Sequence, residues 1–304
     1  MKKEINKKTK ELLFYIALLA FPLVQFFLMY VCVNANSFVL AFKRYDGNSS
    51  TFAGFENFRA ILYDISHDPE ISMALKDSLI AYVVNLLIGI TLALIFSYYI
   101  FKKGLGSNFF RVLLFAPSVI SPLVLVTIFK YFVDSYVPGL LREWSVLDII
   151  GFISESEYVF PTILFYNVFI GFGTSVLMYS NAMSGINDSV IEAAQLDGVN
   201  EFSEFLYIVF PQIFSTVSVF LTTGIASIFN NQLNLFSFFK EGSDYVSTIG
   251  YYMYKEISRA GGDYAVYPKL AALGLLTTLI IAPIVLIARK LFAKMDPMEE
   301  HNGK

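Results

Sequence analysis

Six stretches of this chain are mostly apolar over about 20 consecutive residues, the length that an α-helix needs to cross a bilayer. The expected spans are residues 12–33, 78–101, 112–132, 160–182, 206–229 and 270–292. A chain of 304 residues that is 56% hydrophobic carries more apolar surface than a soluble core of its size can bury. The sequence therefore predicts an all-α integral membrane protein with six transmembrane helices.

Basic residues mark one side of the predicted membrane. They precede the first span and follow the second and the sixth: Lys2, Lys3, Lys7, Lys8, Lys10, Lys102, Lys103, Arg111, Arg289, Lys290 and Lys294. Because cytoplasmic loops carry an excess of Lys and Arg, both termini are expected in the cytoplasm, with tails at 1–11 and 295–304 around a membrane domain at 12–294. The first apolar run is too long for the core of a signal peptide, so we expect it to be retained.

The loop between the fourth and fifth spans, residues 186–211, has the most distinctive pattern in the chain. A polar helix is expected to end at an Asp-Gly pair, and a second, aromatic-rich helix then leads to a proline that opens an apolar run. Alanine favours helix and leaves a low surface that another protein can approach closely, whereas glycine accepts the positive φ that ends a helix. The residues concerned are Glu192, Ala193, Ala194, Asp197, Gly198, Phe202 and Pro211. The loop is expected in the cytoplasm although its charges are all acidic, because acidic residues contribute little to orientation.

This order of residues, from Glu-Ala-Ala through Asp-Gly to the proline, resembles the EAA loop in the membrane subunits of ABC-type importers. The resemblance implies the type I ABC importer permease fold in a bacterial cell membrane. It also implies that the loop at 186–211 holds a coupling helix, seated in a groove of a separate ATPase subunit, and that the seven residues named above serve this coupling. The alternative is an amphipathic cytosolic helix with no special role.

The fourth span carries an amide at membrane depth. Asn167 and Gly171 are four residues apart and therefore share a helix face, and a buried amide in lipid is unfavourable unless it faces protein or water. The stretch resembles the maltose-type permease subunit, on its MalF-like side, where an Asn and a Gly at this spacing line the sugar site. Thr174 stands where that subunit has a Tyr, so the resemblance does not extend to the identity of the sugar. The alternative is that Asn167 bonds to a neighbouring helix and Gly171 allows close packing.

The end of the fifth span matches the same maltose-type pattern at Phe229, Asn230 and Asn231, where an aromatic ring and an adjacent amide contact the sugar. An aromatic face stacks on the apolar face of a pyranose, and an amide both donates to and accepts from hydroxyls. We therefore expect these three residues to line the substrate pathway together with Asn167, Gly171 and Thr174. The alternative is a polar helix end that enters water.

The sequence also predicts the local structure of three further segments. Pro117 and Pro122 are predicted to bend the third span, because proline removes a backbone hydrogen bond, and such bends occur both in gated pathways and in static bundles. Short amphipathic helices are expected outside the membrane at residues 52–62 and 246–257. The first of these segments also resembles the phrase that follows the first span in sugar-importer permeases.

Several kinds of chemistry have no residues to support them. The only Gly-Lys pair, Gly303–Lys304, lacks the glycine frame of a phosphate-binding loop. His67 and His301 lie far apart, and no Cys and His cluster has the spacing of a metal site. No Ser, His and Asp grouping and no carboxylate is expected at membrane depth, which argues against hydrolysis and proton coupling. We expect no catalytic residue, metal or cofactor in this chain, and no nucleic-acid partner, because a net charge of −3 leaves no concentrated basic face.

Together with the resemblance, these features predict the permease subunit of an ATP-driven importer for a sugar or oligosaccharide. The implied partners are the lipid bilayer, a second permease subunit in a heterodimer, two ATPase subunits that bind ATP and Mg²⁺, and an extracellular solute-binding protein. One alternative is a permease for another solute, such as a polyol, glycerol phosphate or a peptide. An anion is disfavoured because no Lys or Arg lies deep within a span. A second alternative is a secondary carrier or membrane enzyme with an incidental EAA-like loop, which would be stable without an ATPase.

Overall fold

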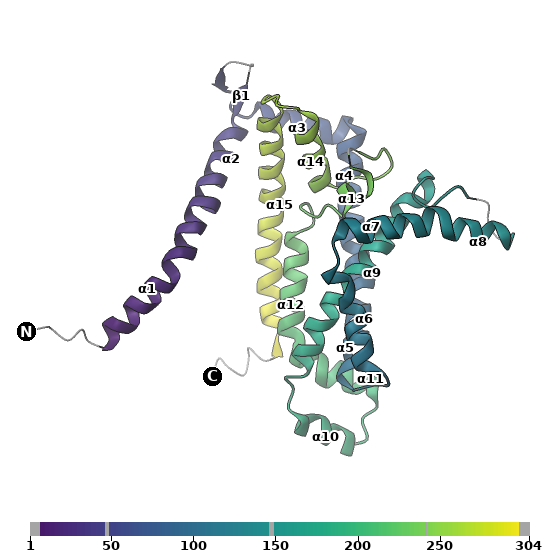
Figure 1. Ribbon diagram of the computed structural model, residues 1–304. Coiled ribbons are helices and arrows are strands. Elements are labelled where there is room, and N and C mark those ends of the chain that lie inside the picture. The colour runs from purple at the N-terminus through teal and green to yellow at the C-terminus, as the bar shows by residue number, and fades with distance from the viewer. Residues whose placement is uncertain (1–6, 46–48, 146–148, 241, 298–304) are drawn as a thin grey trace, which may run out of the picture. The chain divides into compact units, whose positions relative to one another are not determined.

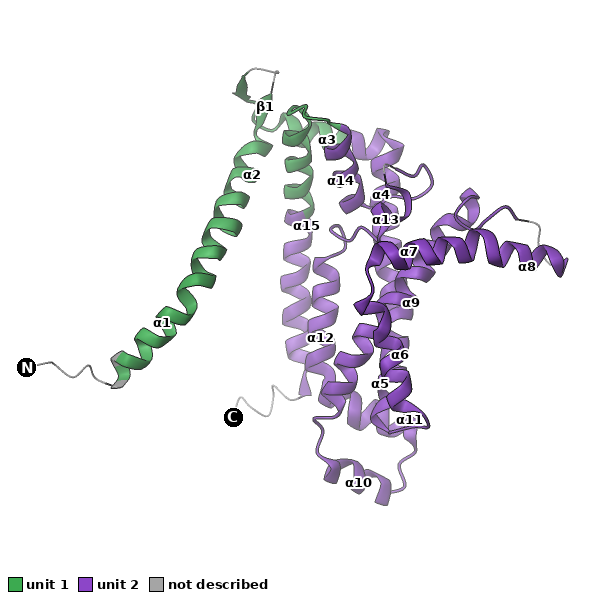
Figure 2. Ribbon diagram, viewed as in Figure 1, with its two compact units in different colours: residues 1–63, 260–277 green, residues 64–259, 278–304 purple. Residues whose placement is uncertain are grey.

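A computed structural model describes residues 7–45, 49–145, 149–240 and 242–297. Parts of the expected tails, together with Lys2, Lys3, His301 and the Gly303–Lys304 pair, lie outside the described residues. The chain divides into two compact units, residues 1–63 with 260–277 and residues 64–259 with 278–304 (Figure 2).

The described residues contain six helices that are long and apolar enough to cross a membrane. They are Lys10–Ala41, Pro69–Phe101, Pro122–Glu143, Ser156–Met183, Glu201–Ala226 and Val266–Met295. The prediction of an all-α membrane protein with six spans is therefore confirmed, and the two strands of the first unit form only a short hairpin.

The first unit begins with one continuous helical run. It consists of α1 (Lys7–Phe26), a π-helical segment η1 (Phe27–Cys32) and α2 (Val33–Ala41) (Figure 1). The most apolar window of this run is 0% buried within the chain, which suits a helix whose neighbours are lipid or another protein. A hairpin follows, in which β1 (Lys43–Tyr45) pairs antiparallel with β2 (Ser50–Phe52).

The expected amphipathic helix at 52–62 is present as α3 (Glu56–His67). Asn57 fixes its start, because the side-chain amide donates to the carbonyls of Ala41 and Lys43, both at 2.8 Å. The ring of Phe42 packs beside this turn against those of two further phenylalanines. The aromatic and amide residues of this segment therefore form a local hydrogen-bonded and packed turn.

The second unit contains most of the remaining helices. In chain order they are α4 (Pro69–Val84), η2 (Asn85–Gly89), α5 (Ile90–Phe101), α6 (Ser107–Val119), α7 (Pro122–Tyr131), η3 (Phe132–Tyr136), α8 (Val137–Glu143), α9 (Ser156–Met183), α10 (Asp188–Leu196), α11 (Glu201–Glu204), η4 (Phe205–Val209), α12 (Phe210–Ala226), α13 (Leu235–Phe239) and α14 (Ile249–Arg259). The last helix, α15 (Val266–Met295), belongs to the first unit up to Thr277 and to the second from Thr278. The segments labelled η are π-helical turns, which place one more residue in the turn than an α-helix does.

The third span differs from its expected bounds of 112–132. The chain does not bend there but breaks, because Ser121 adopts an extended backbone with φ −55° and ψ 131°. The residue before a proline is disfavoured in the α region, so Pro122 starts the new helix α7 and leaves α6 as a separate helix of 13 residues. The membrane-length helix is Pro122–Glu143 instead, while Pro117 stays inside α6.

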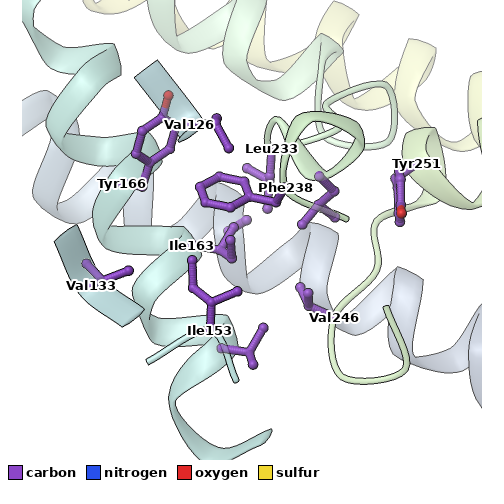
Figure 3. Packing of buried hydrophobic residues seen from close by; sticks show 12 residues of the cluster. Val126, Val133, Ile153, Ile163, Tyr166, Leu233, Phe238, Val246 and Tyr251 are labelled. Carbon is purple, nitrogen blue, oxygen red and sulfur yellow. The ribbon is translucent and has the colours of Figure 1, made fainter. Parts of the chain in front are cut away.

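Two clusters of buried side chains stabilise the second unit, and α9 contributes to both. One includes Tyr166 of α9 and Phe238 of α13 (Figure 3). The other includes Val176 of α9, Ala93 of α5 and Ile213 of α12. Because lipid tails are as apolar as these side chains, the stabilisation comes from close van der Waals packing between the helices.

Candidate functional site

The helix α10 is capped at both ends. Asn187 accepts a hydrogen bond from the backbone N–H of Ser189 at 3.0 Å, which closes the first turn. At the other end Gly198 has a φ of +75°, and the N–H groups of Gly198 and Val199 donate to carbonyls of the last turn, both at 3.1 Å. Glycine adopts this φ without strain, and the paired bonds satisfy the terminal carbonyls. The helix ends at the Asp-Gly pair, as expected.

One face of α10 is open to solvent at the end of the second unit (Figure 1). Glu192 and Ala193 are exposed, and Leu196 is 88% exposed. Ala194 and Ile191 are buried on the opposite face, where Ile191 joins the cluster around Val176. The Glu-Ala-Ala triplet is therefore split between an open face and a packed face.

The segment after α10 is not the separate short helix that the sequence suggested. The elements α11, η4 and α12 form one continuous helix, Glu201–Ala226, which becomes the fifth span. Asn200 caps its start by accepting from a backbone N–H of the first turn at 2.8 Å, and the nearby Phe202 is 73% exposed. The π-helical turn η4 comes shortly before Pro211, which lies inside this continuous helix and removes one backbone hydrogen bond from it.

A buried ion pair joins this helix to the end of α5. Glu204 is 1% exposed, and Nζ of Lys102 donates to its two carboxylate oxygens at 2.9 and 3.1 Å. The hydroxyl of Tyr98 donates to Oε1 of Glu204 at 3.0 Å. In the sequence Lys102 signals only membrane orientation, because no pattern links two residues that lie 102 positions apart.

A cavity of about 310 Å³ lies in the second unit between α4, η2, α9 and the chain that follows α12. Among the described residues that line it, none carries a charge. The polar lining groups are hydroxyls and amides, from Ser78, Tyr82, Asn85, Asn167, Ser175, Ser227, Asn231 and Thr248. The cavity therefore offers neutral donors and acceptors at membrane depth.

The amide of Asn167 bonds mainly to the protein itself. Its Nδ2 donates to the carbonyls of Ile163 and Leu233, both at 2.9 Å. Its Oδ1 accepts from Nδ2 of Asn234 at 2.9 Å. Asn167 thus ties α9 to the segment after α12, which is close to the packing role considered as the alternative. Asn167 also lines the cavity, where its Oδ1 can accept one further hydrogen bond.

Two glycines of α9 have different surroundings. A Cβ on Gly171 would meet no atom within 4 Å, so this glycine leaves open space in the cavity and is not a close-packing site in this chain. A Cβ on Gly173 would overlap the backbone carbonyl of Leu114, so the close approach of α9 and α6 requires glycine there. The packing role considered for Gly171 belongs to Gly173.

Three of the six expected pathway residues line the cavity: Asn167, Gly171 and Asn231. The other three do not, since Phe229 is buried at 8% exposure, and Thr174 and Asn230 are exposed outside it. The sequence assigned no cavity role to Tyr82 or Asn85. Asn85 is an amide inside an apolar span, and the reasoning applied to Asn167 would have identified it.

A buried carboxylate lies within the second span, contrary to expectation. Because α4 begins at Pro69 rather than at residue 78, the second span includes Asp77, which is 6% exposed. Its Oδ2 accepts from the N–H of Ser247 at 3.1 Å, and the adjacent Ser78 hydroxyl accepts from the N–H of Ile249 at 3.0 Å. The two bonds hold the segment that places Thr248 at the cavity.

The sequence matches a family model described as "Binding-protein-dependent transport system inner membrane component" over residues 85–297. This range begins at η2 and includes α10, the Lys102–Glu204 pair and most of the cavity lining.

Curated proteins and solved structures agree with this match. The chain is 28% identical over 223 residues to the probable ABC transporter permease protein YurN of Bacillus subtilis (strain 168), covering 68% of this chain and 73% of that protein. It is 27% identical over 233 residues to the lactose transport system permease protein LacF of Rhizobium radiobacter, covering 74% of each.

Among solved structures, the fold is similar to a chain of a bacterial ABC transporter involved in the import of the acidic polysaccharide alginate. The TM-score is 0.74 at 20% identity, over 94% of this chain and 96% of that one. A structure of the alginate transporter in complex with an alginate pentasaccharide-bound periplasmic protein gives 0.75 at 20% identity, over 95% and 96%. These likenesses confirm the importer permease fold.

Proposed function

We propose a function from one premise: the chain belongs to the family of binding-protein-dependent transport system inner membrane components. It is a multi-pass membrane protein and a transport component rather than an enzyme. We infer that it is the permease subunit of an ATP-driven importer that moves a sugar or oligosaccharide across a bacterial cell membrane. The relatives support this class of solute, because their names include transport systems for lactose, alpha-glucosides and galactooligosaccharides.

The observation that carries the sugar assignment is the chemistry of the cavity. Its described lining combines amides and hydroxyls with the rings of Tyr82 and Phe172, and it contains no charged side chain. Hydroxyl groups of a sugar pair with neutral donors and acceptors, and its apolar ring face packs on aromatic rings. The volume of about 310 Å³ is at the lower end of small-molecule sites, so a longer oligosaccharide extends beyond this chain.

Coupling to ATPase subunits is inferred from α10 and the start of α11. Leu196 and Phe202 are large apolar side chains that remain exposed near Glu192 and Asp197. Apolar side chains exposed next to directional charges suit a helix that docks in a groove of another protein. In this proposal the ATPase subunits bind ATP and Mg²⁺. Five of the expected coupling residues act at or next to that contact: Glu192, Ala193, Asp197, Gly198 and Phe202. Ala194, buried on the opposite face of α10, and Pro211, inside the fifth span, support the loop from behind.

The assembly that we propose contains this chain and a second permease in a heterodimer, two ATPase subunits and an extracellular solute-binding protein. The first span, which is unburied along its apolar window, has a free surface for lipid or the second permease. Lys102 and Lys103 follow α5 at the same end of the second unit as α10 (Figure 1). By the positive-inside rule this end faces the cytoplasm together with both termini, and residues 12–294 form the membrane domain.

The mechanism follows from these contacts. ATP binding closes the ATPase pair and moves α10, which transmits the displacement as a short rigid helix capped at both ends. The attached helices then rotate and open the cavity outward to receive sugar from the binding protein. Hydrolysis returns the cavity to the inward-facing state.

Purification of the tagged chain from its native membrane tests this proposal. We expect ATPase subunits and a second permease to co-elute, and the complex in proteoliposomes to import sugar only with internal ATP and the external binding protein. A chain that is stable alone and accumulates solute without ATP would instead be a secondary carrier. Import of a polyol in preference to any sugar would support the role as an importer and contradict the assignment of a sugar as the solute.

A further inference from the structure

We propose that Tyr98, Lys102 and Glu204 form a clamp that fastens the coupling loop to the helix lining the cavity, so that the two move as one body during transport. These are positioning residues, since none of them lines the cavity or lies on the open face of α10. The role in transport rests on the proposed function, whereas the clamp itself rests on the contacts below.

Tyr98 and Lys102 both donate hydrogen bonds to the carboxylate of Glu204. Glu204 is 1% exposed, and Lys102 is 22% exposed on its side chain. Lys102 donates to both carboxylate oxygens at 2.9 and 3.1 Å, and the Tyr98 hydroxyl lies 3.0 Å from Oε1. The Tyr98 hydroxyl also lies 3.1 Å from the carbonyl of Glu201, and its ring contacts that of Phe205 at 5.1 Å between centroids. The first two turns of the helix Glu201–Ala226 are thereby held to α5.

A buried ion pair at this position is better explained by geometry than by stability. Desolvation of two charges offsets much of their attraction, and a pair of apolar side chains of similar volume commonly holds a fold as well or better. Charge-assisted hydrogen bonds differ from apolar contacts in being directional. They fix the angle between two helices, which a coupling joint needs and a merely packed joint does not supply.

The clamp is connected to the cavity through one continuous helical run. The elements α4, η2 and α5 extend without a break from Pro69 to Phe101, and Tyr82 and Asn85 in this run line the cavity. The rise from Asn85 to Lys102 is about 25 Å at 1.5 Å per residue. A second bond, from the Ser97 hydroxyl to the carbonyl of Val176 at 3.0 Å, ties the same run to α9. Movement of the coupling loop is therefore delivered to two walls of the cavity.

The test uses the complete complex with its ATPase subunits and binding protein in proteoliposomes. The variants are Lys102→Met, Glu204→Met and Tyr98→Phe, which keep the side-chain volume about the same and remove the bonds. We expect each assembled variant to hydrolyse ATP but to import about tenfold fewer sugar molecules per ATP, a loss typical of a broken coupling between sites. The matched control is Glu256→Met, which removes a partner of the half-exposed Arg259 in α14 and should leave the ratio unchanged.

A double variant separates coupling from folding. The charge reversal Lys102→Glu with Glu204→Lys places opposite charges at the two positions again, so it should recover part of the sugar-to-ATP ratio that each single reversal loses. A pair that only stabilised the fold would recover assembly without recovering this ratio. Tyr98→Phe removes one hydroxyl and keeps the ring, so it measures the clamp even if the charged variants fail to assemble.

The outcomes distinguish the clamp from the function on which it rests. Unchanged sugar-to-ATP ratios in the assembled single variants, or a charge reversal that assembles without recovering the ratio, would overturn the clamp while the wild-type complex still imports. A wild-type complex that imports no sugar with ATP would overturn the proposed function, and the role of the clamp in transport with it.

Discussion

The coupling loop and the cavity, at different levels of the second unit, use different kinds of polar group. Near the loop the groups are charged, with the buried Glu204 paired to the partly buried Lys102 and with Glu192 open to solvent. Around the cavity the described groups are amides and hydroxyls. A charge at the centre of a bilayer costs about 2.5–3.5 kcal/mol on insertion scales, whereas a charge near the membrane surface reaches water or a partner.

The chain therefore separates the residues that transmit movement from the residues that line the path of the solute. Charges lie where one body must hold another at a defined angle, and neutral groups lie where a solute must enter and leave. A passage with few strong fixed interactions binds a neutral solute weakly enough to release it. Substitutions in the two regions test this division.

The largest effect is expected on α9, the helix that serves both regions. Gly173→Ala places a methyl group against the backbone carbonyl of Leu114, so α9 and α6 must separate, at a cost of roughly 3 kcal/mol. Thermal unfolding in detergent measures the loss. The control is Gly171→Ala, whose methyl group enters open space and leaves stability unchanged. Equal stability of the two variants would show that α9 is not held tightly at the boundary between the regions.

The second effect concerns the open face of α10. Leu196→Asp should leave the fold intact and weaken capture of the ATPase subunit by about 30-fold, the loss expected for an interface hot spot of about 2 kcal/mol. A titrated pull-down with the purified ATPase subunit measures it. The matched control is Leu105→Asp, at a side chain that is 94% exposed but outside α10. Similar losses from both variants would make the contact a general one rather than a property of the coupling loop.

A smaller effect is expected in the cavity. Asn231→Ala should raise the apparent KM for sugar uptake about fivefold, which corresponds to one hydrogen bond of about 1 kcal/mol. Asn230→Ala should raise it less, because this neighbouring side chain lies outside the cavity. Initial uptake rates at several sugar concentrations distinguish the two. A larger rise in the apparent KM from Asn230→Ala than from Asn231→Ala would show that the sugar contacts Asn230 outside the cavity.

The smallest effect is expected from neutralising the one buried carboxylate beside the cavity. Asp77→Asn retains an oxygen that can accept from the N–H of Ser247, so stability and uptake should stay within about 0.5 kcal/mol of wild type. Asp77→Leu leaves that N–H unpaired and should destabilise by about 1–3 kcal/mol. If Asp77→Asn remained folded and lost uptake, the charge itself would be functional, and the division between charged and neutral regions would fail.

The sequence predicts the coupling loop far better than the cavity, and the reason is physical. The bounds of α10 depend on its own caps and on Gly198, so neighbouring residues along the chain contain the information. The same local reasoning predicts α3 and α14. It also identifies Asn167, because a lone amide within a span must have a partner.

The cavity and the clamp depend instead on contacts between distant segments. Phe229 has the right chemistry for a sugar, but its ring is buried, and α12 ends at Ala226, before it. Asp77 lies within a span because α4 begins at Pro69, about two and a half turns earlier than its apolar residues suggested. In the third span a proline is compatible with a bend or with a break, and the extended backbone of Ser121 before Pro122 makes it a break.

The π-helical turn η2 has a consequence for how this protein tolerates changes in length. Its five residues, Asn85–Gly89, lie in the middle of the continuous run Pro69–Phe101, between Tyr82 at the cavity and Lys102. A π-helical turn holds one more residue than an α-helical turn, so deleting one of the five would leave a regular α-helix with the two halves in nearly the same rotational register. Tyr82 would still face the cavity, and Lys102 would still reach Glu204. Deleting a residue from an α-helical part of the run would instead turn the two halves relative to each other by about 100°, the angle that one residue subtends on a helix. The run can therefore lose one residue at η2 without rotating its solute-facing half against its ATPase-facing half.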